Sequence, residues 1–260
     1  MTVPPAGSPH RRKNALTGEW VTVSPQRTKR PWQGDEADVT EAASVRYDPD
    51  CYLCPGNTRA NGLINPDYAG PWAFDNDFPA LFNEIGPSEI GPNGVGPDVA
   101  SLDETRSADA IPDEVAERQK AAAPESSLFC SEPVSGRCRV LCYSPDHSKT
   151  LTKMTEGELS AVVQLWSDEV RQLRQQYRWV QVFENKGAMM GCSNPHPHGQ
   201  IWAVDSLPTE AVKESMMQAA WFKAHGRLLL DQYRADEERS GERMVVATEH
   251  WSAVVPYWAT

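Results

Sequence analysis

The chain has 260 residues and a formal net charge of −11 at pH 7. This length suffices for one large domain or two small ones, with a core that needs no disulfide bridges. Because the sequence contains neither an apolar run of about 18 residues nor an apolar N-terminal stretch, it indicates no membrane span and no secretory signal. We therefore expect a cytoplasmic protein whose six cysteines are thiols or metal ligands.

Charge is unevenly distributed along the chain. Residues 84–127 hold ten acidic and three basic residues, with four glycines and five prolines, and this composition predicts a solvated, disordered insertion. Residues 10–34 have the opposite bias, six Lys or Arg against one acid. This basic stretch either meets phosphate or forms a solvated face. We expect neither a nucleic acid nor a membrane as a partner.

In chain order, apolar and β-branched runs first predict strands. A short strand at 18–24 is followed by a basic turn and by a turn-rich segment that holds two cysteines. A strand leading into a loop is predicted at 72–81, and a buried strand at 138–145 follows the insertion.

The clearest helix begins at a capping box, in which Thr155 and Glu158 have the required spacing. Apolar residues then recur at helical intervals to about Gln176. Further strands are predicted at 179–185, 196–204, 243–249 and 251–258. A second long helix is predicted between Thr209 and Tyr233. Helices packed on a mostly antiparallel sheet make an α+β fold.

The stretch HPHGQIWAV carries candidate chemistry. Strand side chains alternate between faces, so His196, His198 and Gln200 would share one face. Pro197 cannot donate a ladder hydrogen bond and suits a strand end. Gly199 would let another backbone or a ligand come close.

Cysteine spacing indicates a possible metal site. Cys51 and Cys54 form a C-x2-C pair in a turn, which is half of a tetrahedral zinc site. His147 and His196 are candidates for the other two ligands. Such a site would be structural, because four protein ligands leave no open position. The alternative is a pair of reduced turn cysteines and ordinary surface histidines.

His198 is the candidate nucleophile. A neutral imidazole can attack phosphorus if its second nitrogen is held, for example by a carbonyl of a neighbouring strand such as VFEN. A zinc-bound His196 would fix the strand end and aim His198. Gln200 could bind a phosphate oxygen but, unlike histidine, cannot protonate a leaving group, which favours transfer over hydrolysis. The alternative is a turn with two solvated rings.

Long segments of the chain resemble one family in the family's own order. These segments are HRRKNALTGEWVTVSPQRTKRPWQG, DPDCYLCPGN, FDNDFPAL, SPDHSKTL, WVQVFENKGAMMGCSNPHPHGQIWA and TEHWSAVVPYWA. They resemble galactose-1-phosphate uridylyltransferase, a branch of the histidine-triad superfamily. The resemblance implies a histidine-triad-like α+β fold.

The resemblance also implies a reaction. His198 would attack the α-phosphate of UDP-glucose, form a covalent uridylyl-histidine and release glucose 1-phosphate, and galactose 1-phosphate would then take the uridylyl group. Gln200 replaces the third histidine of the triad. The implied zinc ligands are Cys51, Cys54, His147 and His196. Glu214 matches one iron ligand of the family, whose later histidines have no counterpart here.

Substrate contacts and assembly follow from the same resemblance. The matching positions are Arg27, Thr28, Lys29, Arg30, Ala60, Asn76, Asp77, Phe78, Asn185, Gly191, Cys192, Ser193 and Gln200. Phe78 is expected near the uracil. Family members are homodimers in which the basic RTKR turn contributes to the partner's site.

Domain organisation is expected to follow the family's two related halves. Residues 1–205 would form a histidine-triad-like half containing the acidic insertion, and 206–260 a linker helix and the start of an incomplete second half. Two alternatives to a transferase remain. One is a non-catalytic, zinc-stabilised fragment that binds nucleotide or pairs with a full-length subunit. The other is a nucleotide hydrolase of the histidine-triad group, against which Gln200 argues.

Overall fold

The computed structural model describes residues 7–29, 45–82, 128–192 and 194–259. The predicted insertion at 84–127 lies outside the described residues. Contacts divide the chain into two compact units, one of residues 41–206 and one of residues 1–40 with 207–260. The described residues 7–29 fall in the same unit as the segment after residue 206, and the expected division into 1–205 and 206–260 stays a prediction.

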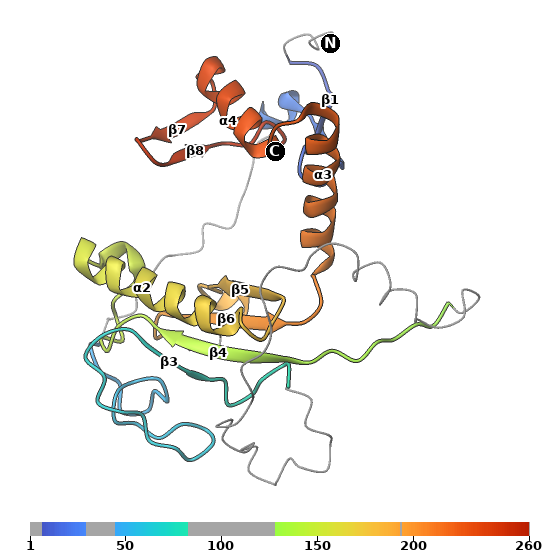
Figure 1. Cartoon of the computed structure of the whole chain (residues 1–260). Helices are drawn as coiled ribbons and strands as arrows, with labels where there is room; N and C mark the ends of the chain where they lie inside the picture. Colours follow the sequence, from blue (N-terminus) through green and yellow to red (C-terminus); the bar gives the residue numbers. More distant parts are fainter. Residues whose placement is uncertain (1–6, 30–44, 83–127, 193, 260) are drawn as a thin grey trace. The chain divides into compact units, whose positions relative to one another are not determined.

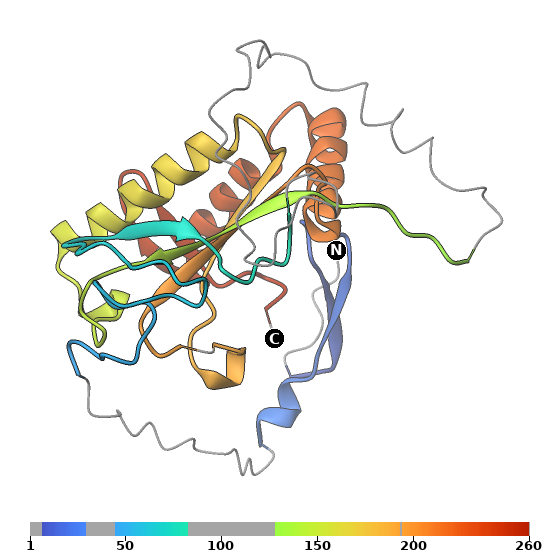
Figure 2. The ribbon, with the colours of Figure 1, turned by 90° about the horizontal axis from the view of Figure 1, so that it is seen from below.

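The larger unit is built on one antiparallel sheet. Its strands are β3 (Trp72–Asp75), β4 (Gly136–Cys142), β6 (His198–Val204) and β5 (Trp179–Phe183), in that order across the sheet. Helix α2 (Glu156–Leu173) covers one face, and the loops of residues 45–71 lie on the other side (Figures 1 and 2). This arrangement confirms the predicted α+β fold.

Helix α2 begins where the sequence predicts. The Thr155 side chain accepts a hydrogen bond from the Glu158 backbone N–H, and the Glu158 carboxylate accepts one from the Thr155 N–H. The helix ends at Leu173, three residues before the predicted Gln176, which lies in a turn. Among the described residues, no helix combines the length and apolar character that crossing a membrane requires.

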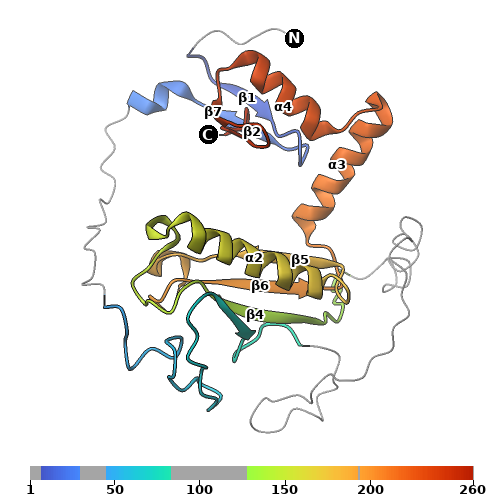
Figure 3. The same cartoon turned by 60° about the vertical axis from the view of Figure 1, so that its left-hand side comes forward.

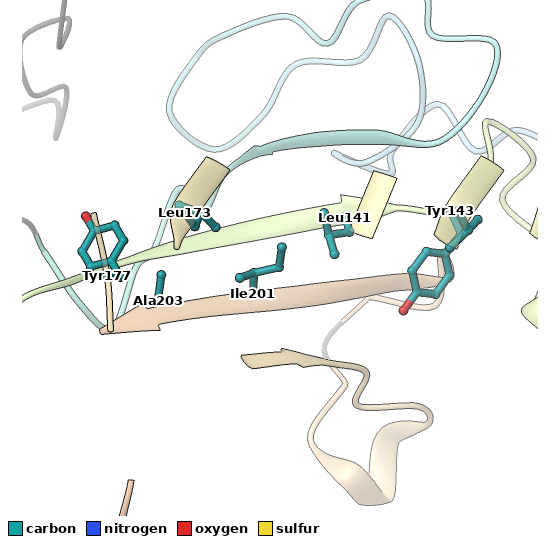
Figure 4. Close-up of a cluster of buried hydrophobic side chains, with 7 residues drawn as sticks. Leu141, Tyr143, Leu173, Tyr177, Ile201 and Ala203 are labelled. Carbon is teal, nitrogen blue, oxygen red and sulfur yellow. The ribbon is translucent and has the colours of Figure 1, made fainter. Parts of the chain in front are cut away.

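Two apolar clusters lie on opposite faces of the sheet. The first packs between the sheet and α2 (Figure 4) and comprises Leu141, Tyr143, Val162, Leu173, Tyr177, Ile201 and Ala203. The second packs the loops onto the other face and comprises Cys51, Leu53, Cys54, Phe74, Val140 and Cys142. Neighbouring residues of β4 therefore contribute to different clusters, as the period of two in a strand requires.

Several predicted boundaries were wrong. Strand β6 starts at His198 rather than at 196. The strand leading into a loop at 72–81 is confirmed, with the strand ending at Asp75. The long helix predicted between Thr209 and Tyr233 is two helices, α3 (Thr209–His225) and α4 (Leu229–Ser240). Gly226 ends α3 in a left-handed conformation with φ 68°, which glycine adopts without steric cost.

The smaller unit contains two hairpins and these two helices (Figure 3). The hairpins pair β1 (His10–Lys13) with β2 (Trp20–Val23), and β7 (Met244–Ala247) with β8 (Ser252–Val254). Strand β1 was not predicted. Lys213 of α3 forms an ion pair with Glu19 at 2.8 Å, and Arg12 donates to the Tyr257 carbonyl at 3.0 Å. These contacts join the first and last segments of the chain.

Candidate metal centre and active site

Four buried side chains converge in the larger unit. The ligand atoms of Cys51, Cys54, His147 and His196 all lie within 4.8 Å of one another. Cys54 Sγ is 3.5 Å from Nδ1 of both histidines, and Cys51 Sγ is 3.8 Å from Nδ1 of His196. The two cysteines come from one turn, while the histidines follow β4 and precede β6.

This geometry fits a zinc ion. With Zn–S about 2.3 Å and Zn–N about 2.05 Å, tetrahedral coordination puts a sulfur and a nitrogen ligand about 3.6 Å apart. The three S–N distances of 3.5, 3.5 and 3.8 Å bracket this value. Four protein ligands leave no open position, so the site would be structural.

His196 has the tautomer that a ligand needs. Its Nε2–H donates to the Ser144 carbonyl at 2.8 Å, because a carbonyl only accepts, and Nδ1 is left as a lone pair facing the sulfurs. Burial lowers the pKa of His196 to about 4, so the ring is neutral at pH 7. Burial also raises the pKa of Cys54 to about 11. A bound cation would reverse this effect by favouring the thiolate.

His198 opens strand β6 directly after this cluster. Its Nδ1–H donates to the carbonyl of His196 at 2.7 Å, which leaves the Nε2 lone pair for chemistry. The expectation that a neighbouring strand such as VFEN supplies this carbonyl was wrong, because the carbonyl belongs to a residue of the same segment. The buried cluster and the candidate nucleophile are thus joined by one short piece of backbone.

His198 and Gln200 share the sheet face opposite α2. They pair with Cys142 and Val140 of β4, whose side chains belong to the cluster on that face. His196 precedes the strand and points into the metal cluster, so it does not extend the row as predicted. Gly199 faces the other way, where an added Cβ would meet the Tyr143 hydroxyl and the Phe183 carbonyl.

His198 lines two clefts. One, of about 400 Å³, is lined by Thr150, Glu184, Asn185, Lys186, Gly187, Cys192, Asn194, Pro195, His196, Pro197 and His198. The other, of about 240 Å³, is lined by Tyr52, Leu53, Phe74, Asn76, Asp77, Phe78, Val140, His198 and Gln200. Because one imidazole lines both clefts, it can contact a group bound in either of them.

Comparison with known proteins assigns the chain to a family. The family model described as "Galactose-1-phosphate uridyl transferase, N-terminal domain" matches residues 3–90 and 107–208. The chain belongs to this family. It is 46% identical to galactose-1-phosphate uridylyltransferase of Haemophilus influenzae and 41% identical to that of Rattus norvegicus. These matches cover 98% and 96% of the chain, but only 64% and 57% of the relatives.

Solved structures show the same fold at lower identity. An ADP-glucose phosphorylase from Arabidopsis thaliana with bound ADP-glucose gives a TM-score of 0.60 at 20% identity, with 97% of this chain and 65% of that chain covered. A uridylyltransferase structure gives 0.57 at 21% identity, with 96% and 62% covered. The family match, the shared fold and the buried group of two cysteines and two histidines are therefore consistent with one another.

The structure brings some of the expected substrate residues together. Asn76, Asp77 and Phe78 line one cleft with His198 and Gln200, whereas Asn185 and Cys192 line the other. Ala60 is exposed, and neither it nor Gly191 lines either cleft.

Other expected residues lie elsewhere. The segment η1 (Pro25–Lys29), which carries Arg27, Thr28 and Lys29, belongs to the smaller unit, as does Glu214 of α3. Among the described residues, Glu214 belongs to no group of side chains that could hold a metal ion. Arg30 and Ser193 lie outside the described residues.

Sequence reasoning missed some residues of the site. Asn194 is buried, and its Oδ1 accepts from the His196 N–H at 2.9 Å, which fixes the backbone that leads into β6. An asparagine in a turn often accepts a hydrogen bond from the backbone N–H two residues later, so the sequence did contain a signal for this contact. Asn61, which also contacts Asp77, offers the same signal, because its Oδ1 accepts from the Leu63 N–H two residues later. Arg59, the other residue that contacts Asp77, gave no such signal.

Proposed function

We propose that the protein transfers a uridylyl group from UDP-glucose to galactose 1-phosphate. The observation that carries this proposal is the orientation of His198, whose ring lines both clefts and whose Nδ1–H is held by the His196 carbonyl. Among the described residues, no hydrogen bond occupies its Nε2. The relatives' names, galactose-1-phosphate uridylyltransferase, supply the substrates. The chain spans 64% and 57% of these relatives' length, and the activity in their names is therefore proposed for it.

In the first step, the Nε2 lone pair of His198 attacks the α-phosphorus of UDP-glucose. A P–N bond forms, the bond from phosphorus to the bridging oxygen breaks, and glucose 1-phosphate leaves with the bond's electron pair. A phosphate oxygen of galactose 1-phosphate then attacks the same phosphorus, forms UDP-galactose and returns the lone pair to His198. A covalent intermediate of this kind divides one transfer into two steps.

Other residues of the cleft orient the phosphate. The hydrogen bond from Nδ1 to the His196 carbonyl stabilises the positive charge that develops on the ring. Gln200, on the same face, donates a hydrogen bond from its amide to a phosphate oxygen. Unlike histidine, it can neither protonate a leaving group nor take a proton from water. Asn76, Asp77 and Phe78 line the cleft that would take the nucleoside, with Phe78 near the uracil.

The metal site has a supporting role in this proposal. Cys51, Cys54, His147 and His196 would hold zinc, which would supply structural rigidity rather than a reactive position. His196 would thereby fix the carbonyl that orients His198. Iron at Glu214, a homodimer with a shared RTKR turn, and a cytoplasmic location are further expectations from the sequence.

Covalent labelling tests the proposal. We expect His198→Asn to abolish transfer of label from UDP-glucose carrying radioactive uridine, measured on denatured protein after separation from free nucleotide. His250→Asn, which changes a histidine with a 76% exposed side chain, is the matched control and should label normally. Label on the His198 variant would disprove the assignment of the nucleophile.

Product analysis separates transfer from the alternatives. With galactose 1-phosphate present, the proposal predicts UDP-galactose and glucose 1-phosphate, whereas a hydrolase would release UMP. A folded, zinc-containing protein that binds UMP but takes up no label would support the non-catalytic alternative instead.

A further inference from the structure

The nucleoside cleft contains one carboxylate whose surroundings are unusually ordered. Asp77 lines this cleft, although its side chain is only 6% exposed. Its Oδ1 faces two donors, Nη1 of Arg59 at 3.2 Å and Nδ2 of Asn61 at 2.8 Å. Among the described residues, Oδ2 has no hydrogen-bond partner. Oδ1 is therefore held by its neighbours, and Oδ2 can accept a hydrogen bond from a ligand.

Arg59 is held in place from several sides. Its side chain is 9% exposed, and its guanidinium lies 4.4 Å from the centroid of the Phe74 ring. Nη1 also donates to the Asp75 carbonyl at 3.4 Å. A planar guanidinium packed on an aromatic face has little freedom, so it fixes the direction of its ion pair. Its charge also offsets that of Asp77.

Asn61 is ordered by its own turn. Its Oδ1 accepts from the Leu63 N–H at 2.9 Å, and this contact turns Nδ2 toward Asp77. The turn is closed by backbone hydrogen bonds from Arg59 to Leu63 and from Gly62 to Arg59. Two side chains from one rigid turn thus meet the same carboxylate oxygen.

We propose that Arg59 and Asn61 are positioning residues that present Asp77 Oδ2 as an acceptor for a neutral donor of the nucleoside, a ribose hydroxyl or a base N–H. This inference rests on the proposed function, since it places a nucleotide in this cleft. An ionised carboxylate accepts hydrogen bonds but does not donate them. It also repels phosphate, which directs the phosphates away from Asp77 and toward His198. Arg59 reduces that repulsion enough for an anionic substrate to enter.

A change from amide to acid at Asn61 tests this arrangement. Asn61→Asp keeps the oxygen that accepts from Leu63 but replaces the donor to Asp77 with a second carboxylate. We expect UMP to bind the variant about tenfold more weakly in a calorimetric titration, the effect of losing one well-placed charged hydrogen bond. Gln164→Glu is the matched control, because Gln164 donates to the exposed Asp168 on α2 in the same way. It should bind UMP like the wild type.

Exchanging the Asp77 carboxylate and the Asn61 amide separates an effect on UMP binding from an effect on protein stability. The double variant Asn61→Asp, Asp77→Asn restores a hydrogen bond between the two positions but moves the carboxylate out of the cleft. We expect its thermal stability to return to that of the wild type while UMP affinity stays at least tenfold reduced. Restored affinity would overturn the proposal, and so would an Asn61→Asp variant with normal affinity.

Two further comparisons complete the test. If the Asn61→Asp effect is lost with 2′,3′-dideoxy-UMP, the donor is a ribose hydroxyl, and if it persists, the donor belongs to the base. Should Asn61→Asp fail to fold, Arg59→Lys, which keeps the charge but loses the planar fork, should weaken UMP binding severalfold. If the wild-type protein binds UMP but takes up no label at His198, this result contradicts the proposed transferase activity. It does not contradict the positioning role of Arg59 and Asn61.

Discussion

At the residue scale, each polar side chain of the HPHGQ stretch has a different environment. His196 lies in the buried Cys2His2 group, His198 lines both clefts, and Gln200 lines only the cleft that also contains Asp77. The sequence predicted that His196 joins the cysteine pair, and the structure brings these side chains together. The roles of His198 as nucleophile and of Gln200 as phosphate ligand stay predictions. The sequence did not predict that the His196 carbonyl holds His198, since backbone direction before a strand depends on the turn that precedes it.

Gly199 is the residue for which the structure makes the sharpest stability prediction. Gly199→Ala should destabilise the larger unit by about 2 kcal/mol, because the added methyl group would overlap the Tyr143 hydroxyl and make a tight contact with the Phe183 carbonyl. Urea unfolding followed by circular dichroism measures the loss. Gly157→Ala on α2, where an added methyl group meets nothing within 4 Å, should be neutral or slightly stabilising. Equal stability of both variants would contradict the close packing at Gly199.

At the element scale, α2 illustrates which boundaries a sequence can fix. Its start was predicted correctly because a capping box is local and involves only Thr155 and Glu158. The break at Gly226 was missed because the apolar pattern continues across it. The sequence does contain a stop signal there, since the glycine follows a last turn with Lys223 and His225. Strand ends were predicted less well, since they depend on where neighbouring strands stop pairing.

The cap of α2 can be measured directly. Thr155→Ala should lower the free energy of unfolding by about 1 kcal/mol, because the Glu158 N–H loses its side-chain acceptor. Thermal or urea unfolding detects the change. Thr209→Ala, at the first residue of a helix whose cap has no side-chain hydrogen bond, is the control and should have little effect. A loss as large at Thr209 would show that the cap is not the cause.

At the scale of the whole molecule, the metal ligands connect segments far apart in the chain. The turn that carries Cys51 and Cys54, the end of β4 and the approach to β6 meet at one buried point. The same point adjoins the cluster of apolar side chains on the sheet face opposite α2. Loss of a ligand should therefore affect both the stability of the larger unit and the orientation of His198.

Metal analysis tests this role. We expect about one zinc per chain in purified protein, with loss of zinc and a lower unfolding temperature in Cys51→Ser. A strong chelator should lower the unfolding temperature of the wild type toward that of this variant. Cys130→Ser, which changes an exposed cysteine outside the cluster, should retain the metal. Folded wild-type protein without zinc would refute a structural zinc site.

The sequence by itself determined the chemistry that the chain carries. Residue types and short spacings can be recognised without knowing the fold. They include the metal-ligand types, the neutral Gln200, the cap of α2 and the resemblance to one family. Only the tertiary structure decided which atoms face each other. The His196 carbonyl behind His198, the Tyr143 hydroxyl beside Gly199, and the Arg59 and Asn61 donors beside Asp77 all arise where separate segments pack, and packing distances are set by the whole fold rather than by local sequence.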